Sequence, residues 1–299
     1  MKRFLFPSLA AIMASVTPVF ADPATYATPH DAFMALIDAA SAQDRDAVLT
    51  VFGPENEDLI STGNAAEDQR NRQEILQMYR EGYRMEPQDD GEIVIALGTD
   101  SWPFPVPLAQ TEAGWAFDAE AGRAEVQNRE IGGNELEIID LMDAYGDVQA
   151  AFRLVDQNGD GVMEFARRII SDADARDGLF WPGPDSPIGA DMARAAADGF
   201  SDGEIDFDPD PYQGYYFRIL TGQTDAAPGG AMEYVVNGHM LAGHALLAVP
   251  SAYGETGIHS FMVSENGIIL EADLGRETLD IAADMTLYDP GEVWSPVTE

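Results

Sequence analysis

The part of the sequence with the most specific chemistry is a run of oxygen-bearing side chains between residues 156 and 164. Asp156, Asn158 and Asp160 have the spacing of positions one, three and five of an EF-hand calcium loop, and a glycine follows at position six for the sharp turn. A backbone carbonyl at position seven and a carboxylate at position nine would add two more oxygens. Because Ca²⁺ prefers about six to eight hard oxygen ligands, this spacing predicts a calcium site. Its predicted ligands are Asp156, Asn158, Asp160, the carbonyl of Val162, and Glu164.

The loop departs from the EF-hand pattern at position twelve, where Arg167 stands in place of a bidentate glutamate. We expect a helix over residues 134–155 before the loop and a second, exiting helix over residues 165–170 after it. A carboxylate from elsewhere, such as Asp172 or Asp174, would then close the site. The alternative is a turn rich in Asp and Asn that joins the two helices without a metal.

A second acidic segment precedes the C-terminal strands. Its six carboxylates could gather another cation, although the prolines at positions 209 and 211 favour a solvated loop. These carboxylates belong to Asp198, Asp202, Glu204, Asp206, Asp208 and Asp210.

The four histidines are interpreted as structural. His239 and His244 are five residues apart in a strand pattern, so their side chains point to opposite faces and cannot bind one metal together. His30 falls in the first turn of a predicted helix, and His259 lies in a strand beside a serine that faces away from it.

A hydrolase acting on envelope glycan or peptide through carboxylates is the alternative function. The aromatic side chains of residues 212–217 could stack a sugar, but their alternation favours a strand with one face in the core. Carboxylates are too numerous to single out an acid and a base, and no nucleophile and base pair is evident. No catalytic residue is predicted, and a protein without enzymatic activity is the preferred interpretation.

Composition excludes several classes of site. The 299 residues include no cysteine, which excludes disulfides, thiolate zinc sites, iron–sulfur clusters and a cysteine nucleophile. Lys2 is the only lysine, so a P-loop lysine and a Schiff base are excluded. The formal charge of -37 disfavours nucleic acids and anionic lipid surfaces as partners.

The first residues resemble a secretory leader. Lys2 and Arg3 precede an apolar stretch from Phe4 to Phe20, and small residues at 19 and 21 suit cleavage after Ala21. Residues 1–21 are therefore predicted to be a signal peptide, which places the mature chain in the periplasm or outside the cell. We expect no lipid anchor, because no cysteine follows the cleavage point, and no integral membrane segment.

Two modules are expected in the mature chain, at residues 22–128 and 129–299. The first begins with a helix capped by Thr28, continues with helices over 44–52 and about 65–83, and ends with strands near 92–97, 102–107 and 114–118. Helices followed by a curled antiparallel sheet are typical of cystatin-like and NTF2-like α+β folds.

The second module is expected to pair a long helix with an antiparallel meander. An apolar stripe of Leu136, Ile139, Met142, Tyr145 and Phe152 marks the helix over 134–155. A strand at 215–220 and two hairpins, at Asn237-Gly238 and Asn266-Gly267, follow the calcium-type loop. This order is similar to the globular part of a type IV pilin. The predicted class of the whole chain is therefore α+β.

Several phrases together resemble a family of exported bacterial proteins catalogued as domain of unknown function 2950. They are ENEDLIS at 55–61, WPFP at 102–105, REIG at 129–132, DGLFWP at 177–182 and PYQGYYFRIL at 211–220. The resemblance runs from about residue 26 to 298. It implies export and one shared architecture, and it carries no established activity or catalytic residues. We therefore expect an exported cell-envelope protein with a structural calcium loop, acting in envelope assembly or in interaction with an envelope protein or glycan.

Overall fold

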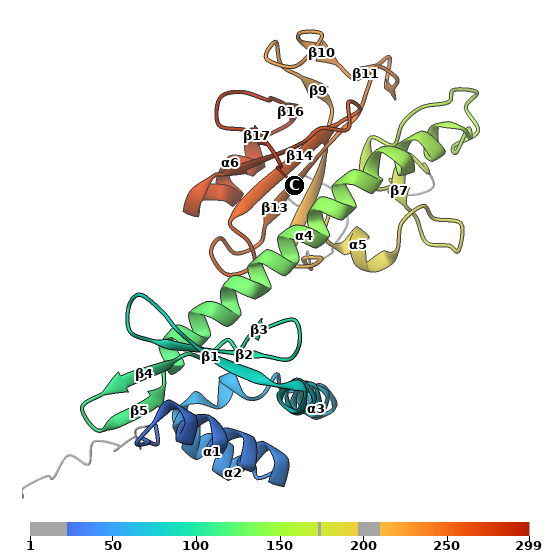
Figure 1. The fold of residues 1–299 in the computed structure, drawn as a ribbon. Coiled ribbons are helices and arrows are strands. Elements are labelled where there is room, and N and C mark those ends of the chain that lie inside the picture. The colour runs from blue at the N-terminus through green and yellow to red at the C-terminus, as the bar shows by residue number, and fades with distance from the viewer. Residues whose placement is uncertain (1–22, 173–174, 197–209, 299) are drawn as a thin grey trace, which may run out of the picture. The chain divides into compact units, whose positions relative to one another are not determined.

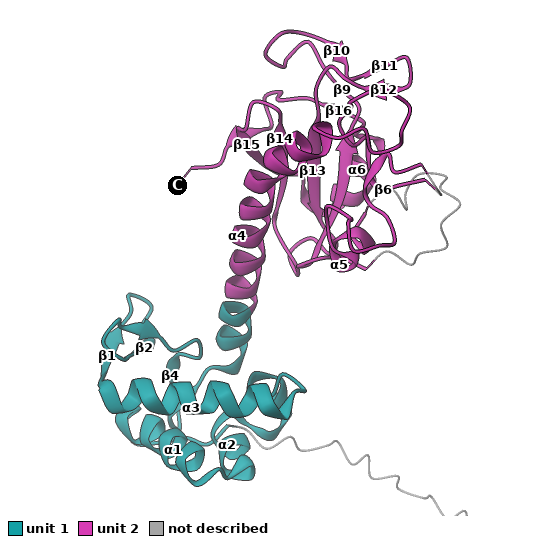
Figure 2. Ribbon diagram, turned by 90° about the vertical axis from the view of Figure 1, so that its right-hand side faces the viewer, with its two compact units in different colours: residues 1–126 teal, residues 127–299 magenta. Residues whose placement is uncertain are grey.

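The computed structural model describes residues 23–172, 175–196 and 210–298. The chain divides into two compact units, residues 1–126 and 127–299, and the boundary falls inside the long helix α4 (Ala119–Arg153) (Figure 2). The predicted leader, Asp174, and the acidic segment from Asp198 to Asp208 lie outside the described residues.

The unit of residues 1–126 combines N-terminal helices with an antiparallel sheet (Figure 1). Its helices before α4 are α1 (Pro29–Ala42), α2 (Arg45–Phe52), the 3₁₀ helix η1 (Pro54–Leu59) and α3 (Ala65–Glu81). Its strands are β1 (Tyr83–Pro87), β2 (Ile93–Leu97), β3 (Trp102–Pro103), β4 (Leu108–Thr111) and β5 (Gly114–Phe117). The strand order is β1-β2-β4-β5, with β3 paired to β2.

Local capping contacts set the starts of the first two helices, and the Thr28 cap is the one that was predicted. The Thr28 hydroxyl accepts a hydrogen bond from the backbone N–H of Asp31 at 3.1 Å, and Pro29 opens α1. Asp44 caps α2 by accepting from the backbone N–H of Ala47 at 3.0 Å. The helices and the sheet share one apolar core, whose fully buried side chains include Phe33, Ile95, Leu97, Leu108 and Phe117.

Two expectations for this unit are corrected. The third helix ends at Glu81, because Gly82 takes a φ of 132° and Tyr83 begins β1, which the sequence did not indicate. The sheet is antiparallel as expected, but no curled sheet is found among its described strands. Strands β2 and β4 are paired only at Ile93–Leu108.

The unit of residues 127–299 contains the second part of α4 and an antiparallel sheet of the order β17-β15-β14-β13-β8. These strands are β8 (Tyr215–Leu220), β13 (Ala245–Pro250), β14 (His259–Ser264), β15 (Ile269–Asp273) and β17 (Ser295–Pro296). Around them lie β6 (Arg168–Ile170), β7 (Gly178–Phe180), α5 (Ala190–Arg194), β9 (Gly222–Gln223), β10 (Met232–Glu233), β11 (Val235–Val236), β12 (His239–Met240), η3 (Gly275–Glu277), α6 (Thr278–Asp284) and β16 (Leu287–Tyr288).

The core of this unit lies between α4 and the antiparallel sheet. Figure 1 shows α4 running alongside these strands, and the Tyr145 hydroxyl donates to the backbone carbonyl of Ala245 in β13 at 3.3 Å. Burial raises the pKa of the Tyr145 hydroxyl, which therefore stays neutral. The aromatic residues of β8 were predicted to alternate between the core and the other face of the strand. Tyr215 and Phe217 are fully buried, while Tyr216 is half-buried, which confirms this alternation.

The buried face of α4 differs in one residue from the predicted stripe. Leu136 is 66% exposed, whereas Ile138 is fully buried. Ile138, Met142, Tyr145 and Phe152 recur with a near-helical period, and a residue two positions before Ile138 lies about 200° around the helix from it. Leu136 consequently faces away from the core. The helix itself also begins earlier than predicted, at Ala119.

Both predicted Asn-Gly hairpins are present, with different turns. Asn237 and Gly238 both take positive φ, at 53° and 88°, as a two-residue type I′ turn between β11 and β12 requires. Between β14 and β15 only Gly267 has positive φ, at 74°, and its N–H donates to the Ser264 carbonyl, so this loop is longer.

None of the described helices combines the length and the apolar character needed to cross a bilayer.

Candidate metal site

The loop after α4 is shaped by Asp156. One oxygen of its carboxylate accepts the backbone N–H groups of Gly159 and Asp160, at 2.8 and 3.2 Å, and the other accepts that of Gly161 at 2.9 Å. Gly159 and Gly161 have φ values of 76° and 88°, which glycine adopts without steric cost. Asp156 therefore holds the backbone of the loop around its own carboxylate.

Two further carboxylates turn toward one another inside this loop. Asp160 accepts the backbone N–H of Val162 with Oδ1 at 2.8 Å and the amide of Asn158 with Oδ2 at 2.9 Å. The Glu164 side chain is buried; its Oε2 accepts the backbone N–H of Met240 at 2.9 Å, and its Oε1 lies 3.4 Å from the Asn158 amide. One oxygen of each carboxylate is thus held by backbone, and the other faces Asn158.

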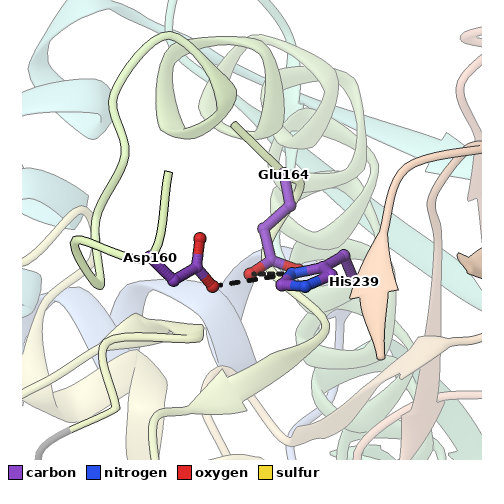
Figure 3. Close-up of side chains that lie close together, drawn as sticks. All are labelled: Asp160, Glu164 and His239. Atoms are coloured by element: carbon purple, nitrogen blue, oxygen red, sulfur yellow. Dashed lines mark ion pairs between the residues drawn. The ribbon is translucent and has the colours of Figure 1, made fainter. Parts of the chain in front are cut away.

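His239 completes the cluster from a hairpin far along the chain. Its Nδ1 lies 3.6 Å from Asp160 Oδ2 and 3.4 Å from Glu164 Oε1 (Figure 3). This nitrogen is buried and forms no hydrogen bond with any residue that the structure describes. One ligand atom from each of the three side chains lies within 4.8 Å of the others. Their geometry is that of a group able to hold a metal ion.

The hairpin that carries His239 is fastened to the loop by its backbone. Besides the contact of the Met240 N–H with Glu164, the Met240 carbonyl accepts the N–H of Phe165 at 2.9 Å. Arg167 donates to the carbonyl of Gly238 at 3.2 Å, and its guanidinium is held by two bonds of 2.8 and 2.7 Å to Asp177, which is buried. Arg167, at loop position twelve, therefore binds the hairpin backbone and is not a metal ligand.

The predicted exiting helix over residues 165–170 is wrong. Arg168–Ile170 form β6, which pairs in parallel with β7, so their backbone groups bond to another strand instead of along a helix. A Cβ at Gly178 would lie 2.7 Å from the backbone nitrogen of Ser171, which shows how closely the two strands approach. Without the second helix, the loop has the ligand spacing of an EF-hand but not its fold.

Of the two carboxylates named as able to close the site, Asp172 has other partners. The backbone N–H of Asp172 donates to Asp177, and its side chain pairs with Arg168. Asp172 is outside the group of side chains described above, and Asp174 is not among the described residues. Val162, whose carbonyl was a predicted ligand, donates its backbone N–H to Asp160.

Sequence reasoning missed His239. The Asn-Gly pair before it indicated the hairpin correctly, but no local pattern connects that hairpin with a loop 75 residues earlier in the chain. His244 lies outside the cluster and is packed edge-on against Tyr145 and Phe165. Burial lowers the pKa of His244 to about 4, with a smaller contribution from the charge of Arg153.

The other two histidines have neighbours of their own. His30 is exposed and its Nδ1 lies 3.0 Å from the Tyr83 hydroxyl. His259 Nδ1 lies 3.2 Å from Glu135, whose other carboxylate oxygen accepts the N–H groups of Ile258 and His259. These contacts tie the segment before β14 to α4.

A hollow of about 360 Å³ lies near α6, with Leu274, Met285 and Trp294 among its apolar walls. Two carboxylates, of Asp284 and Asp289, also line it, and Asp289 already accepts a hydrogen bond from Thr224 at 2.8 Å. Its walls are mainly apolar, so it offers fewer convergent polar groups than the loop.

The fold and the site define an α+β protein with a cluster of two carboxylates and one imidazole beside its C-terminal sheet. The family model described as protein of unknown function (DUF2950) matches residues 23–297. The chain therefore belongs to the DUF2950 family. No curated protein and no solved structure matches it.

Proposed function

We propose that the chain is an exported protein of the cell envelope, without enzymatic activity, in which a calcium ion bound by the 156–164 loop stabilises the C-terminal unit. The observation that carries the proposal is the convergence of Asp160 and Glu164 on Asn158, with each carboxylate already positioned by a backbone N–H. Such preorganised oxygens lose little freedom when an ion binds.

Electrostatics supports a cation at this point. Two carboxylates that face one another repel unless a positive charge lies between them, and the chain as a whole is strongly acidic. In the ion-bound loop, a half-turn of the Asn158 amide would present its oxygen in place of its NH₂ group, with loss of the hydrogen bond of 3.1 Å that this oxygen accepts from the Asp160 N–H. The ion would then join the end of α4 to β12, because Glu164 is bonded to Met240.

A role in envelope assembly or interaction is supported by the predicted leader and by the arrangement of the second unit. A long helix alongside an antiparallel sheet is similar in shape to the globular part of a type IV pilin, and the partner we propose is an envelope protein or glycan. The two modules of the mature chain would be residues 22–128 and 129–299.

The predicted leader can be tested directly. When the full chain is expressed in a Gram-negative host, we expect the mature protein to begin at Asp22 and to be recovered from the periplasm or the medium. N-terminal sequencing and intact mass measure this. A chain that keeps Met1 and stays in the cytoplasm or the membrane fraction would contradict export.

Calcium is expected to stabilise the C-terminal unit measurably. The absence of a glutamate at position twelve suggests a dissociation constant of roughly 10⁻⁴–10⁻³ M. A hundredfold excess of Ca²⁺ over this constant adds about 2.7 kcal/mol to the free energy of unfolding, which raises the melting temperature by roughly 5–10 °C for a unit of this size. Mg²⁺ should have a much smaller effect, because it demands a tighter octahedral shell.

Asp160→Ala should remove most of this response while the chain remains folded without calcium. The matched control is Asp147→Ala, which removes an exposed carboxylate of α4 outside the loop and should keep the full calcium response. Scanning calorimetry with and without the ion measures each variant. Equal melting of wild type and Asp160→Ala under all conditions would show that the loop is only a turn.

A further inference from the structure

An oxygen-only calcium loop does not account for His239. Calcium takes oxygen ligands, yet a buried imidazole nitrogen lies beside the two carboxylate oxygens that face into the loop. We propose that Asp160, Glu164 and His239 also form a binding site for a borderline transition-metal dication, of which Zn²⁺ is the representative. The inference rests on the proposed function in one respect, since both ions would use Asp160 and Glu164.

The separations suit such an ion. Zinc binds histidine nitrogen and carboxylate oxygen at about 2.0–2.2 Å in a tetrahedral arrangement, which places two ligands about 3.4 Å apart. His239 Nδ1 lies 3.4 Å from Glu164 Oε1 and 3.6 Å from Asp160 Oδ2. An octahedral calcium ion would give similar spacings, so distance alone does not choose the metal. The choice comes from the nitrogen, because imidazole suits zinc, copper and nickel.

The side chains of the cluster are held in place by contacts with the surrounding backbone. Glu164 is only 7% exposed, and its second oxygen is fixed by the Met240 N–H, so Oε1 is held toward the histidine. The hairpin is fixed in turn by the bond from Phe165 to the Met240 carbonyl and by Arg167 on the Gly238 carbonyl. The positive charge of Arg167 is paired with the buried carboxylate of Asp177 and therefore does not oppose a metal ion strongly.

Arg167 thus acts as a positioning residue. It stands at loop position twelve, where an EF-hand would have its bidentate glutamate, and it holds the turn from which His239 projects. In place of the sixth oxygen ligand of an EF-hand, the loop has Arg167. By bonding to the Gly238 carbonyl, Arg167 holds the hairpin so that the His239 nitrogen lies beside the carboxylates. A bound ion would link the loop to the β11–β12 hairpin, with water completing its shell.

The test uses the full mature chain, freed of metal with a chelator, and three variants. His239→Ala removes the nitrogen, Asp160→Ala removes an oxygen shared by both ions, and His30→Gln removes an exposed histidine from the other unit. Zn²⁺ binding is followed by isothermal titration in the presence of a competing chelator. Co²⁺ replaces zinc for visible absorption, because its bands report tetrahedral coordination by nitrogen and oxygen.

We expect wild type and His30→Gln to bind one Zn²⁺ with the same affinity and to give the same tetrahedral Co²⁺ spectrum. His239→Ala should bind Zn²⁺ at least about tenfold more weakly, since even groups that only orient a ligand are worth 10–100-fold in affinity. It should also lose the cobalt spectrum while retaining its melting response to Ca²⁺. Excess Ca²⁺ should weaken Zn²⁺ binding to wild type by competition for Asp160 and Glu164.

The outcomes separate the two proposals. If His239→Ala binds Zn²⁺ as tightly as wild type, or if no tetrahedral Co²⁺ spectrum forms, the transition-metal site does not exist, whatever calcium does. If wild type responds to Zn²⁺ through His239 but not to Ca²⁺, the calcium proposal fails and the present inference stands. If Asp160→Ala abolishes both responses and His239→Ala only that to Zn²⁺, both are supported.

Discussion

Replacing Arg218 with methionine is expected to lower the free energy of unfolding of the C-terminal unit by about 3–4 kcal/mol. Arg218 lies in β8 and is 8% exposed. Its Nη1 donates to the backbone carbonyls of Ala282, Ala283 and Met285, at 2.9, 2.8 and 3.2 Å, where α6 ends. The Ala282 carbonyl also accepts the N–H of Met285 at 3.2 Å, but carbonyls at the C-terminal end of a helix lack the full set of intrahelical donors, and the negative end of the helix dipole favours a cation there. Methionine fills a similar volume but leaves them without this donor.

Urea unfolding measures the loss, and hydrogen exchange of the α6 amides locates it. Arg218→Lys should be intermediate, because one ammonium group keeps the charge but cannot reproduce the planar guanidinium. Arg276→Met is the matched control, since Arg276 is exposed in η3 beside the same helix, and its loss should change stability by less than about 0.5 kcal/mol. Unchanged stability of Arg218→Met would show that α6 does not depend on this buried cation.

Acid is expected to destabilise the C-terminal unit through His244. Burial between Tyr145 and Phe165 lowers the pKa of His244 to about 4 from an ordinary value of 6.5. As the pH falls below 6.5 the unfolded chain binds a proton that the folded chain does not accept until about pH 4. Stability is therefore lost between these two values, and the loss is complete below the lower one. The difference between the two pKa values corresponds to about 3 kcal/mol.

His244→Phe removes the titrating group and keeps an aromatic ring between its neighbours. We expect its free energy of unfolding to fall less than that of wild type between pH 6.5 and 4, with the difference reaching about 3 kcal/mol. His244→Gln, which keeps polarity but cannot titrate in this range, should show the same flattened dependence even if it is less stable at pH 7. Urea unfolding across the pH range measures this, and parallel curves for all three proteins would contradict the assignment.

Protonation of His244 would also affect the candidate metal site, because Phe165 directly follows Glu164. Phe165 contacts the His244 ring and lies under the guanidinium of Arg153, and its N–H bonds to the hairpin carbonyl of Met240. A charge on His244 would disturb the residue that joins the loop to the hairpin. Measurements of metal binding are therefore best made above pH 6.5, where His244 of the folded chain is neutral.

The sequence by itself determined the features that depend on a few neighbouring residues. Thr28 marks a helix start because its side chain bonds to the N–H group three residues ahead. Asn237-Gly238 marks a hairpin because both residues adopt positive φ. The spacing of Asp156, Asn158 and Asp160 predicted a calcium loop, which stays a prediction; the contacts seen within this loop are local and span five residues or fewer.

Only the tertiary structure decided the features that depend on distant partners. Residues 168–170 form a strand because β7 offers backbone partners, and Leu136 is exposed because the sheet packs against the other side of α4. His239 reaches the loop because the Gly238 carbonyl meets Arg167 and Met240 bonds to Glu164. Local propensity fixes φ and the nearest hydrogen bonds, whereas the meeting of residues 160 and 239 depends on how the whole sheet packs, and no short sequence pattern encodes that.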